Sequence, residues 1–522
     1  MADDQGRTLE GCEEEQLIKR EKKKFTSSVL IACVIAASSG LMFGYVIGIS
    51  GGVSAMKDFL AKFFPSISRD PSKGSSGSGN YCRYNDQLLQ LFTSSTYIVG
   101  LISTFGASYT TRDLGRKPTM LIAGIFYLVG TVLNAGAQSL PMLIIGRVFL
   151  GCGIGFGNQA TPLYLSEVAP PHLRGGLNIL FQLNITTGIL IANLVNYFTA
   201  AYPWGWRLSF ALGGIPSLLL TLGSFVLSET PNSLIERGYL TQGKQVLEKI
   251  RGTDQVEEEF NDLVEVGVAS SLIKNPFRDI IRRKNLPPLI CAICLQFFQQ
   301  AGGINAIMFY SPVLFETVGF GSNASLVSTV VIGGINAVCT IISMVVVDRF
   351  GRKILLLEAG VQLFIAQVGI AILLGLGLKD SVNLLTPMQA MAVVLMVCLF
   401  ISGFAWSWGP LAWLVASEVF PLEVRSAGQS ITVSTNLLFT FAMAQSFLSM
   451  LCVLKYGIFI LFAAFLVAMT LFAALLLPET KGIPIEEMSG LWKRHWLWRR
   501  FLDDFSMEIT GVQARRVLWP EI

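Results

Sequence analysis

Histidine and charged residues are scarce in this sequence of 522 residues. It contains two histidines, and Asp, Glu, Lys and Arg together make up 14% of the chain, against roughly 25% in soluble domains. The nine cysteines are not spaced like metal ligands, and the long apolar segments contain neither histidine nor paired carboxylates. These scarcities argue against a soluble enzyme, and they leave no catalytic centre, metal site or bound cofactor to predict.

Long apolar runs occupy most of the chain instead. Hydrophobic residues make up 52% of it, and the mean hydropathy is +0.57. Twelve runs have about the 20 residues that cross a bilayer. They fall near 26–50, 87–110, 118–137, 141–163, 176–198 and 207–228, and, after a charged stretch, near 287–311, 324–347, 354–377, 388–415, 427–451 and 456–477. We therefore predict an all-α membrane protein with 12 transmembrane helices in two halves of six.

The predicted spans divide the chain into five segments. These are a tail (1–25), a six-helix half (26–228), a linker with short amphipathic helices (229–286), a second six-helix half (287–477) and a second tail (478–522). Basic residues gather in alternate connections, at 19–24, 112–117, 278–284, 349–353 and 493–500. The positive-inside rule explains these clusters better than nucleic-acid binding does, and it places both termini in the cytosol. The loop 51–86 then lies outside.

Short charged motifs occur once in each half. Ser166-Glu167-Val168, followed by Arg174, returns 251 residues later as Ser417-Glu418-Val419, followed by Arg425. The loops 112–117 and 348–353 both end in Gly-Arg-Lys, and Glu-Thr occurs at 229–230 and again at 479–480. Two like halves in a membrane are the architecture of an alternating-access carrier, which holds its substrate between them.

Amide side chains gather in the seventh predicted span. Gln296, Gln299, Gln300 and Asn305 lie within ten residues, and the pair Gly302-Gly303 can break the helix there, as in many carriers. Amides in hydrocarbon are costly unless they face a polar partner, and because they both donate and accept they suit neutral polyols. Hydrogen bonds between helices are the alternative, but a cluster of this size favours a binding site. Further candidates are Gln182, Asn336, Asn436 and Trp413.

These motifs, with Pro478-Glu479-Thr480-Lys481-Gly482, resemble the sugar porter family of the major facilitator superfamily from about residue 25 to residue 500. The outer-loop cysteine and the closing Trp-Lys-Arg-His-Trp at 492–496 are similar to those of the plant sugar transport proteins. Those proteins are monosaccharide/proton symporters of the plasma membrane. The resemblance implies the major facilitator fold and a monosaccharide substrate. We expect no enzymatic activity, because the spans contain no catalytic residues, and a monomer as the functional unit, because each chain holds a whole pathway.

The resemblance also implies roles for individual residues. Those that bind the sugar would be Gln182, Gln299, Gln300, Asn305, Asn336, Trp413 and Asn436, with Phe43 and Ile47 lining the site from the first span. A cytosolic latch that holds the outward-facing state would consist of Arg112, Gly115, Arg116, Glu167, Arg174, Asp348, Arg349, Arg352, Glu418 and Arg425.

Cys82 and Cys452 both lie in predicted outer loops. Because that side of the membrane is oxidising, a disulfide between them is favoured over two free cysteines. The resemblance implies the same bridge, which would join the outer mouths of the two halves.

One residue departs from the family in a consequential way. The first span usually contains Phe-Gly-Tyr-Asp, and this chain has Val46 in place of the aspartate. In the symporters that aspartate carries the proton and pairs with an arginine of the fourth span, here Arg147. Valine cannot titrate, and the pKa of arginine lies far above physiological pH. The proton that the family uses as its coupling ion therefore has no evident carrier in this chain.

Three interpretations remain open. The chain is a facilitator without proton coupling, a symporter coupled through another group, or a sensor that does not transport. If Val46 is natural we expect facilitated diffusion, and if it is an isolated substitution the parent was a symporter. Sensors on this scaffold signal through long cytosolic extensions, and this sequence has only about 25 residues before the first span and about 40 after the last. We therefore expect a carrier.

Overall fold

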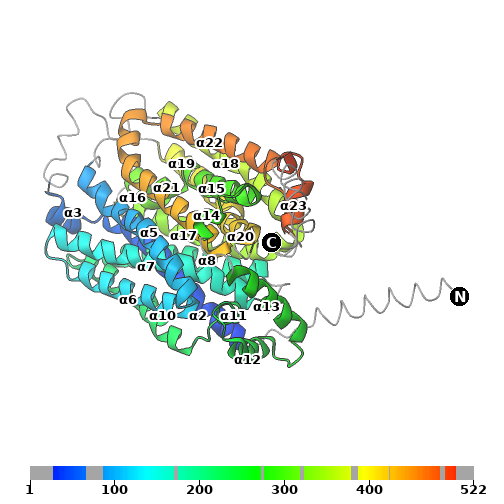
Figure 1. Cartoon of the computed structure of the whole chain (residues 1–522). Helices are drawn as coiled ribbons and strands as arrows, with labels where there is room; N and C mark the ends of the chain where they lie inside the picture. The colour runs from blue at the N-terminus through cyan, green and yellow to red at the C-terminus, as the bar shows by residue number, and fades with distance from the viewer. Residues whose placement is uncertain are drawn as a thin grey trace.

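The computed structural model describes residues 27–65, 86–169, 174–271, 276–317, 322–377, 386–421, 424–481 and 488–500. In these ranges every regular element is helical. Twelve helical segments are long and apolar enough to cross a membrane, which confirms the predicted number of spans. Figure 1 shows them side by side in two groups, one coloured blue to teal and one green to orange.

The first group contains six spans. They are α2 (Ser27–Val53), α5 (Gln87–Asp113), α6 (Arg116–Ala135), α7 (Leu140–Val168), α8 (Arg174–Thr199), and α9 (Gly205–Leu212) continued by α10 (Gly214–Val226). The short helix α3 (Lys57–Phe63) follows α2. Apolar side chains such as Ile102, Val132 and Leu222 are exposed on the outside of this group, as expected of a surface that faces lipid.

The second group is built from α15 (Leu286–Ala301) with α16 (Ile304–Thr317), α17 (Ser322–Phe350), α18 (Arg352–Gly377), α19 (Pro387–Gly403) with η4 (Phe404–Trp408) and α20 (Gly409–Val419), α21 (Arg425–Leu454), and α22 (Gly457–Leu475). Two seams join it to the first group, since α5 packs along α21 and α8 along α17.

The predicted break in the seventh span is confirmed. Helix α15 ends at Ala301 and α16 begins at Ile304. Gly303 has φ +89°, a conformation that glycine adopts without strain. A Cβ at this position would also come within 2.5 Å of the Phe462 ring. The tenth span has a break that the sequence did not predict, because η4 is a π-helical turn directly before Gly409-Pro410, and π turns of this kind are frequent at functional sites.

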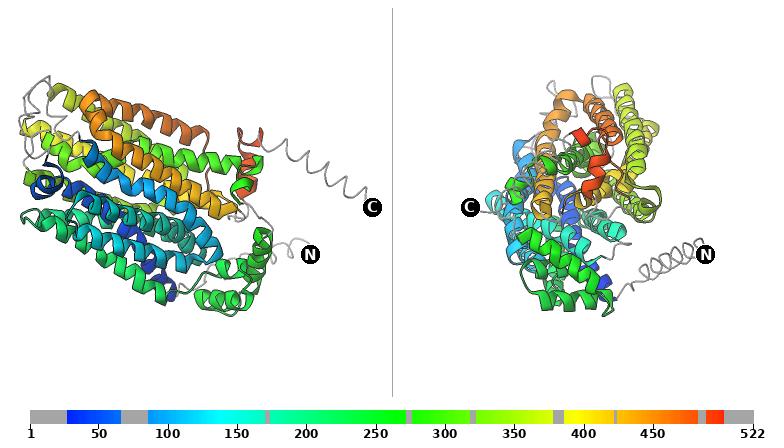
Figure 2. Two further views of the ribbon diagram at one scale, coloured as in Figure 1. Left: turned by 60° about the vertical axis from the view of Figure 1, so that its left-hand side comes forward. Right: turned by 45° about the vertical axis from the view of Figure 1, so that its right-hand side comes forward.

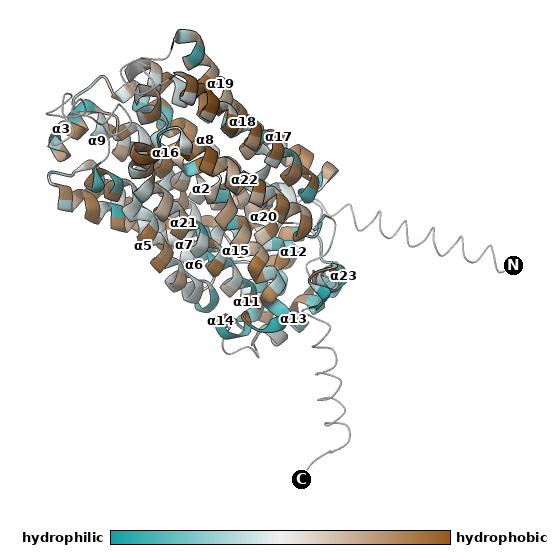
Figure 3. Ribbon diagram, turned by 90° about the horizontal axis from the view of Figure 1, so that it is seen from above, coloured by the Kyte–Doolittle hydropathy of each residue, from teal (hydrophilic) through white to brown (hydrophobic). Residues whose placement is uncertain are grey.

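The remaining helices lie at one end of the bundle. They are α11 (Pro231–Glu236), α12 (Leu240–Arg251), α13 (Glu257–Ser271), α14 (Pro276–Asp279) and η3 (Arg283–Asn285) between the two groups, and α23 (Met488–Arg494) after them. Figure 2 shows α12, α13 and α23 together at this end, which we call the linker end, with α3 at the opposite, or α3, end. Figure 3 shows hydrophilic residues concentrated on α13, α14 and α23, whereas the spans are mainly hydrophobic.

Candidate functional site

Three of the predicted amides form one hydrogen-bonded cluster beside the break in the seventh span. The amide nitrogen of Asn436 donates to Oε1 of Gln296 at 2.7 Å and to Oε1 of Gln299 at 2.8 Å. The nitrogen of Gln299 donates to the carbonyl oxygens of Trp408 at 3.0 Å and Gly409 at 3.1 Å. The cluster therefore joins α15 and α21 to the π turn of the tenth span.

Two more amides extend the cluster across the break. Asn305 Nδ2 donates to Gln300 Oε1 and, at 3.1 Å, to Thr440 Oγ1. Gln300 Nε2 donates to Gln299 Oε1 at 3.3 Å. All of these amides are buried. The group mixes donors and acceptors and carries no net charge, which suits a neutral ligand rich in hydroxyl groups.

The other predicted contacts lie around this cluster. A Cβ built on Gly409 would lie 3.4 Å from Gln182 Nε2, so this amide of the first half approaches the tenth span. The Trp413 ring lies edge-on to Phe181, with centroids 6.1 Å apart. Asn336 is buried, and its Oδ1 has no hydrogen-bond partner in the part of the chain that the structure describes. Such an acceptor is costly unless a ligand or water satisfies it.

Phe43 and Ile47 are both buried on α2. The Phe43 ring packs edge-on against Tyr97 of α5 at 6.5 Å. Among the hydrogen bonds and ring contacts given for the described residues, none joins Phe43, Ile47 or Asn336 directly to the amide cluster. Their predicted roles as sugar contacts therefore remain predictions.

Hydrogen bonds join the two halves at both ends of the bundle. At the linker end, Arg425 Nη2 of the second half donates to Ser166 Oγ of the first at 2.9 Å, and Asn178 Nδ2 donates to Ser417 Oγ at 2.6 Å. At the α3 end, Ser94 Oγ donates to Gln445 Oε1 at 2.6 Å. The two halves therefore contact each other at both ends of the bundle.

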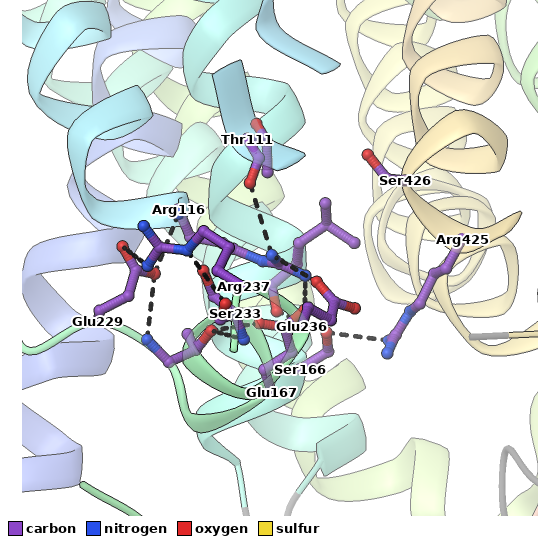
Figure 4. Close-up of polar contacts among 12 residues, drawn as sticks. Thr111, Arg116, Ser166, Glu167, Glu229, Ser233, Glu236, Arg237, Arg425 and Ser426 are labelled. Carbon is purple, nitrogen blue, oxygen red and sulfur yellow. Dashed lines mark hydrogen bonds and ion pairs between the residues drawn. The ribbon is translucent and has the colours of Figure 1, made fainter. Parts of the chain in front are cut away.

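One half of the predicted latch is drawn in Figure 4. Arg116 Nη2 pairs with Glu167 Oε1 at 2.8 Å, and its Nη1 pairs with Glu236 Oε2 of α11 at 3.0 Å. Glu167 Oε2 accepts from Thr230 Oγ1 at 2.6 Å. Glu229 accepts from the backbone N–H groups of Arg116 at 3.0 Å and Lys117 at 3.2 Å, so it caps the start of α6. We call these five residues (Arg116, Glu167, Glu229, Thr230, Glu236) the first-half latch.

The second half repeats this arrangement. Arg352 Nη2 pairs with Glu418 Oε1 at 3.0 Å, and Thr480 Oγ1 donates to Glu418 Oε2 at 2.9 Å. Glu479 accepts from the backbone N–H groups of Arg352 at 3.0 Å and of Lys353 at 2.9 Å. Arg352 Nη1 pairs with Asp348 Oδ1 at 3.2 Å. These residues (Arg352, Glu418, Glu479, Thr480, Asp348) form the second-half latch.

Five of the ten predicted latch residues belong to these two groups, namely Arg116, Glu167, Asp348, Arg352 and Glu418. Gly115 and Gly351 make the turns that precede α6 and α18, with φ +105° and +88°. Arg425 reaches across to the other half, and it also donates to the carbonyl of Ser417 at 3.2 Å. Arg112 and Arg349 lie at the ends of α5 and α17. The side chain of Arg174 lies outside what the structure describes.

Sequence reasoning did not include Glu229, Thr230, Glu479 and Thr480 in the latch. The signal was present, because the Glu-Thr pair occurs once in each half. Glu236 also has a counterpart at the same spacing, Glu486, which lies outside the described residues.

Arg147 lies on α7 and is completely buried. Its Nη1 donates to Ser50 Oγ at 2.9 Å, and Ser50 in turn donates to the carbonyl of Val46 at 2.7 Å. The Phe92 and Phe210 rings lie 3.9 Å and 5.3 Å from the guanidinium carbon. Nε and Nη2 have no hydrogen-bond partner among the described residues. The backbone of Val46 is thus linked to Arg147 through the Ser50 hydroxyl, and the Val46 side chain provides no carboxylate.

The structure places an acid inside a span that sequence reasoning did not single out. Glu358 lies about two turns into α18. It is exposed on the same face as Ile354, Val361 and Ile365, a pattern typical of a surface that faces lipid. It belongs to the second half, whereas Arg147 belongs to the first.

Cys452 is disulfide-bonded. Cys82 lies outside the described residues, so its pairing with Cys452 stays a prediction. The cysteines at 33, 152, 291, 294, 339 and 398 are free.

Residues 32–492 match the sequence profile of the family described as sugar (and other) transporter. The chain belongs to the sugar porter family. It is 60% identical over 486 residues to sugar transport protein 13 of Arabidopsis thaliana, covering 92% of each chain. It is also 60% identical over 483 residues to sugar transport protein MST4 of Oryza sativa subsp. japonica, covering 92% of this chain and 93% of the relative.

Solved structures agree with this assignment. The proton:xylose symporter XylE bound to 6-bromo-6-deoxy-D-glucose superimposes with a TM-score of 0.77 at 25% identity, over 90% of this chain and all of that one. The family resemblance and the major facilitator fold predicted from the motifs are thereby confirmed. A sugar porter is a multi-pass membrane transporter and not an enzyme.

Proposed function

We propose that this sugar porter moves a monosaccharide across the plasma membrane by alternating access, as a monomer. The observation that carries the proposal is the buried, uncharged amide cluster at the break of the seventh span. We also propose that the tails 1–25 and 478–522 and the linker 229–286 lie in the cytosol and that the loop 51–86 lies outside. The names of the relatives, which are sugar transport proteins, support a sugar as the substrate.

Sugar binding at this cluster is an exchange of hydrogen bonds. Gln299, Gln300, Asn305 and Asn436 now donate to one another and to backbone carbonyls. A pyranose hydroxyl both donates and accepts, so it can replace those partners without leaving a buried amide unpaired, which would cost about 1 to 3 kcal/mol per group. Trp413 offers an apolar face to the C–H side of the ring, and the unpaired Oδ1 of Asn336 can accept from a hydroxyl.

The two latches supply the second element of alternating access. Each fastens the ends of its own helices, and Arg425 bonds to Ser166 across the halves. Opening toward the linker end requires the bonds between the halves to break, whereas opening toward the α3 end leaves them intact.

We further propose that transport is facilitated diffusion, although membership of the family alone would lead us to expect symport with protons. Val46 cannot bind a proton, and no described residue gives Arg147 a carboxylate that could do so in its place. A carrier whose only titrating group at this position is a permanently charged arginine cannot bind a proton on one side and release it on the other.

The test is uptake of labelled glucose by yeast that lacks its own hexose carriers. It is measured at two external pH values, with and without a protonophore. Uptake that depends on neither the external pH nor the protonophore, and that never exceeds equilibrium, supports facilitated diffusion. Accumulation of sugar that the protonophore abolishes refutes it. Gln299→Ala, expressed at the same level, should raise the KM about 10-fold or more, since it removes a buried amide from the cluster. Absence of uptake with both tails removed would favour a sensor.

A further inference from the structure

Arg147 presents an unusual electrostatic situation for a membrane interior. It is fully buried, and the one hydrogen bond described for its side chain goes to the hydroxyl of Ser50. An arginine stays protonated at any physiological pH. A buried charge without a counter-charge is strongly destabilising, so something must neutralise it in the folded protein.

Aromatic rings close the region toward the α3 end. Phe92 lies over the guanidinium, and it contacts Phe59 of α3 at 5.2 Å and Phe64 at 6.3 Å between ring centroids. Phe210 lies on another side of the guanidinium and packs against Trp206 at 6.5 Å. Ring faces attract a cation, but they provide neither a negative charge nor a hydrogen-bond acceptor comparable to a carboxylate.

The two nitrogens without partners lie on one edge of the guanidinium. Nε and Nη2 direct their N–H bonds side by side, and this is the edge through which arginine binds an anion with two hydrogen bonds. The hydroxyl of Tyr97 is a second buried group without a hydrogen-bond partner among the described residues, and it lies within electrostatic range of Arg147. The region thus has unused donors and one net positive charge.

We propose that Arg147 binds a small monovalent anion, of the size of chloride, through its Nε–Nη2 edge. The anion supplies the negative charge that Val46 lacks. A cation is excluded by the charge of Arg147, and a large organic anion by the surrounding rings. The site is distinct from the amide cluster, and it does not depend on the proposed sugar transport.

The experiment uses the purified full-length protein in detergent and contains no sugar. Its melting midpoint is measured while chloride or bromide replaces gluconate at a constant ionic strength of about 0.2 M. We expect a saturable rise of about 2 °C or more with either halide, since a ligand that binds only the folded state stabilises it. An equal midpoint in halide and gluconate at every concentration would refute the proposal.

Two substitutions at one position separate this site from halide binding elsewhere. In Val46→Asp the new carboxylate lies one helical turn from Ser50 and provides the counter-charge, so the halide response should be lost. Val46→Leu is the matched control, and it should keep the response because it adds no charge. If Val46→Asp shows the same halide-dependent rise as the unmodified chain, the ion binds elsewhere and the proposal is wrong. A halide response without any sugar uptake would leave the anion site standing and refute only the proposed transport.

Discussion

The first-half latch and the second-half latch have four bonds in common and differ in the fifth. In each, an arginine pairs with a glutamate, a threonine donates to the same glutamate, and a second glutamate caps two backbone N–H groups. The fifth bond joins Arg116 to Glu236 of the linker helix α11 but joins Arg352 to Asp348 of its own preceding helix α17.

The repeated sequence explains this difference. Arg112 occupies the position in the first half that Asp348 occupies in the second. The first half therefore lacks an acid four residues before its latch arginine, and Glu236 of the linker provides the second carboxylate. The consequence is mechanical. The first-half latch fastens the linker to the bundle, whereas none of the bonds given above for the second-half latch involves the linker.

The largest expected effect comes from removing the two arginines. Arg116→Ala removes the arginine that pairs with the Glu167 side chain, 3% exposed, and Arg352→Ala removes one ion-pair partner of Glu418, which is 10% exposed. Loss of one partner of a buried pair costs about 3 to 5 kcal/mol. We expect both variants to melt at lower temperature, with Arg116→Ala the more destabilised because its glutamate is more deeply buried.

Hydrogen exchange should show which helices each substitution destabilises. Arg116→Ala should speed exchange at the start of α6 and also in α11, because Glu236 is released. Arg352→Ala should speed exchange at the start of α18 and leave α11 unchanged. Equal exchange in α11 for the two variants would show that the linker is not held through Arg116. The proposed difference between the two latches would then be wrong.

A smaller effect is expected from the fifth bond alone. The Glu236 side chain is 29% exposed and that of Asp348 is 46% exposed, so solvent screens both pairs, and each contributes about 0.3 to 1 kcal/mol. Glu236→Gln should therefore lower the melting midpoint slightly and loosen α11. Asp348→Asn is the matched control in the other half, and it should loosen only the junction of α17 and α18. A reversed order of the two effects on α11 would contradict the proposed role of Glu236.

Features that follow from local pattern could be predicted from the sequence. The number of spans follows from hydropathy and length, and the break of the seventh span follows from two adjacent glycines, one of which adopts φ +89°. The grouping of Gly115, Arg116 and Glu167 is implied by the resemblance to the sugar porters, and the recurrence of these residues in the second half favours it over solvated charges.

Features that depend on contacts between distant segments could not be predicted. The capping of α6 by Glu229 joins residues 113 positions apart, and the repeated Glu-Thr pair does not specify which backbone groups the glutamate caps. The π turn of η4 and the hydrogen bonds that satisfy the amides among themselves depend on how α15, α20 and α21 pack. Amide side chains in a span indicate a polar site, but their hydrogen-bond partners can be identified only once the helices are assembled.

The smallest expected effect is a pH dependence of the segment that follows the second half. His495 follows α23, and its ring lies 6.1 Å from that of Trp496 and 6.4 Å from that of Trp498. The indole nitrogens of these tryptophans donate to the carbonyls of Leu475 at 3.1 Å and Leu476 at 2.8 Å, at the end of α22. Partial burial, and secondly the charge of Lys353, lower the pKa of His495 below its ordinary 6.5.

Because the folded state binds this proton less readily than the unfolded state, the docked segment is most stable above pH 6.5 and loses stability as the pH falls below that value. Acidification should therefore change the tryptophan fluorescence of this segment and speed exchange at the end of α22, while the first-half latch is unaffected. His495→Gln keeps a polar side chain of similar reach but cannot be protonated, so it should remove the pH step. If the pH step persists in His495→Gln, a group other than His495 controls how this segment docks against α22. The pH dependence attributed to His495 would then be wrong.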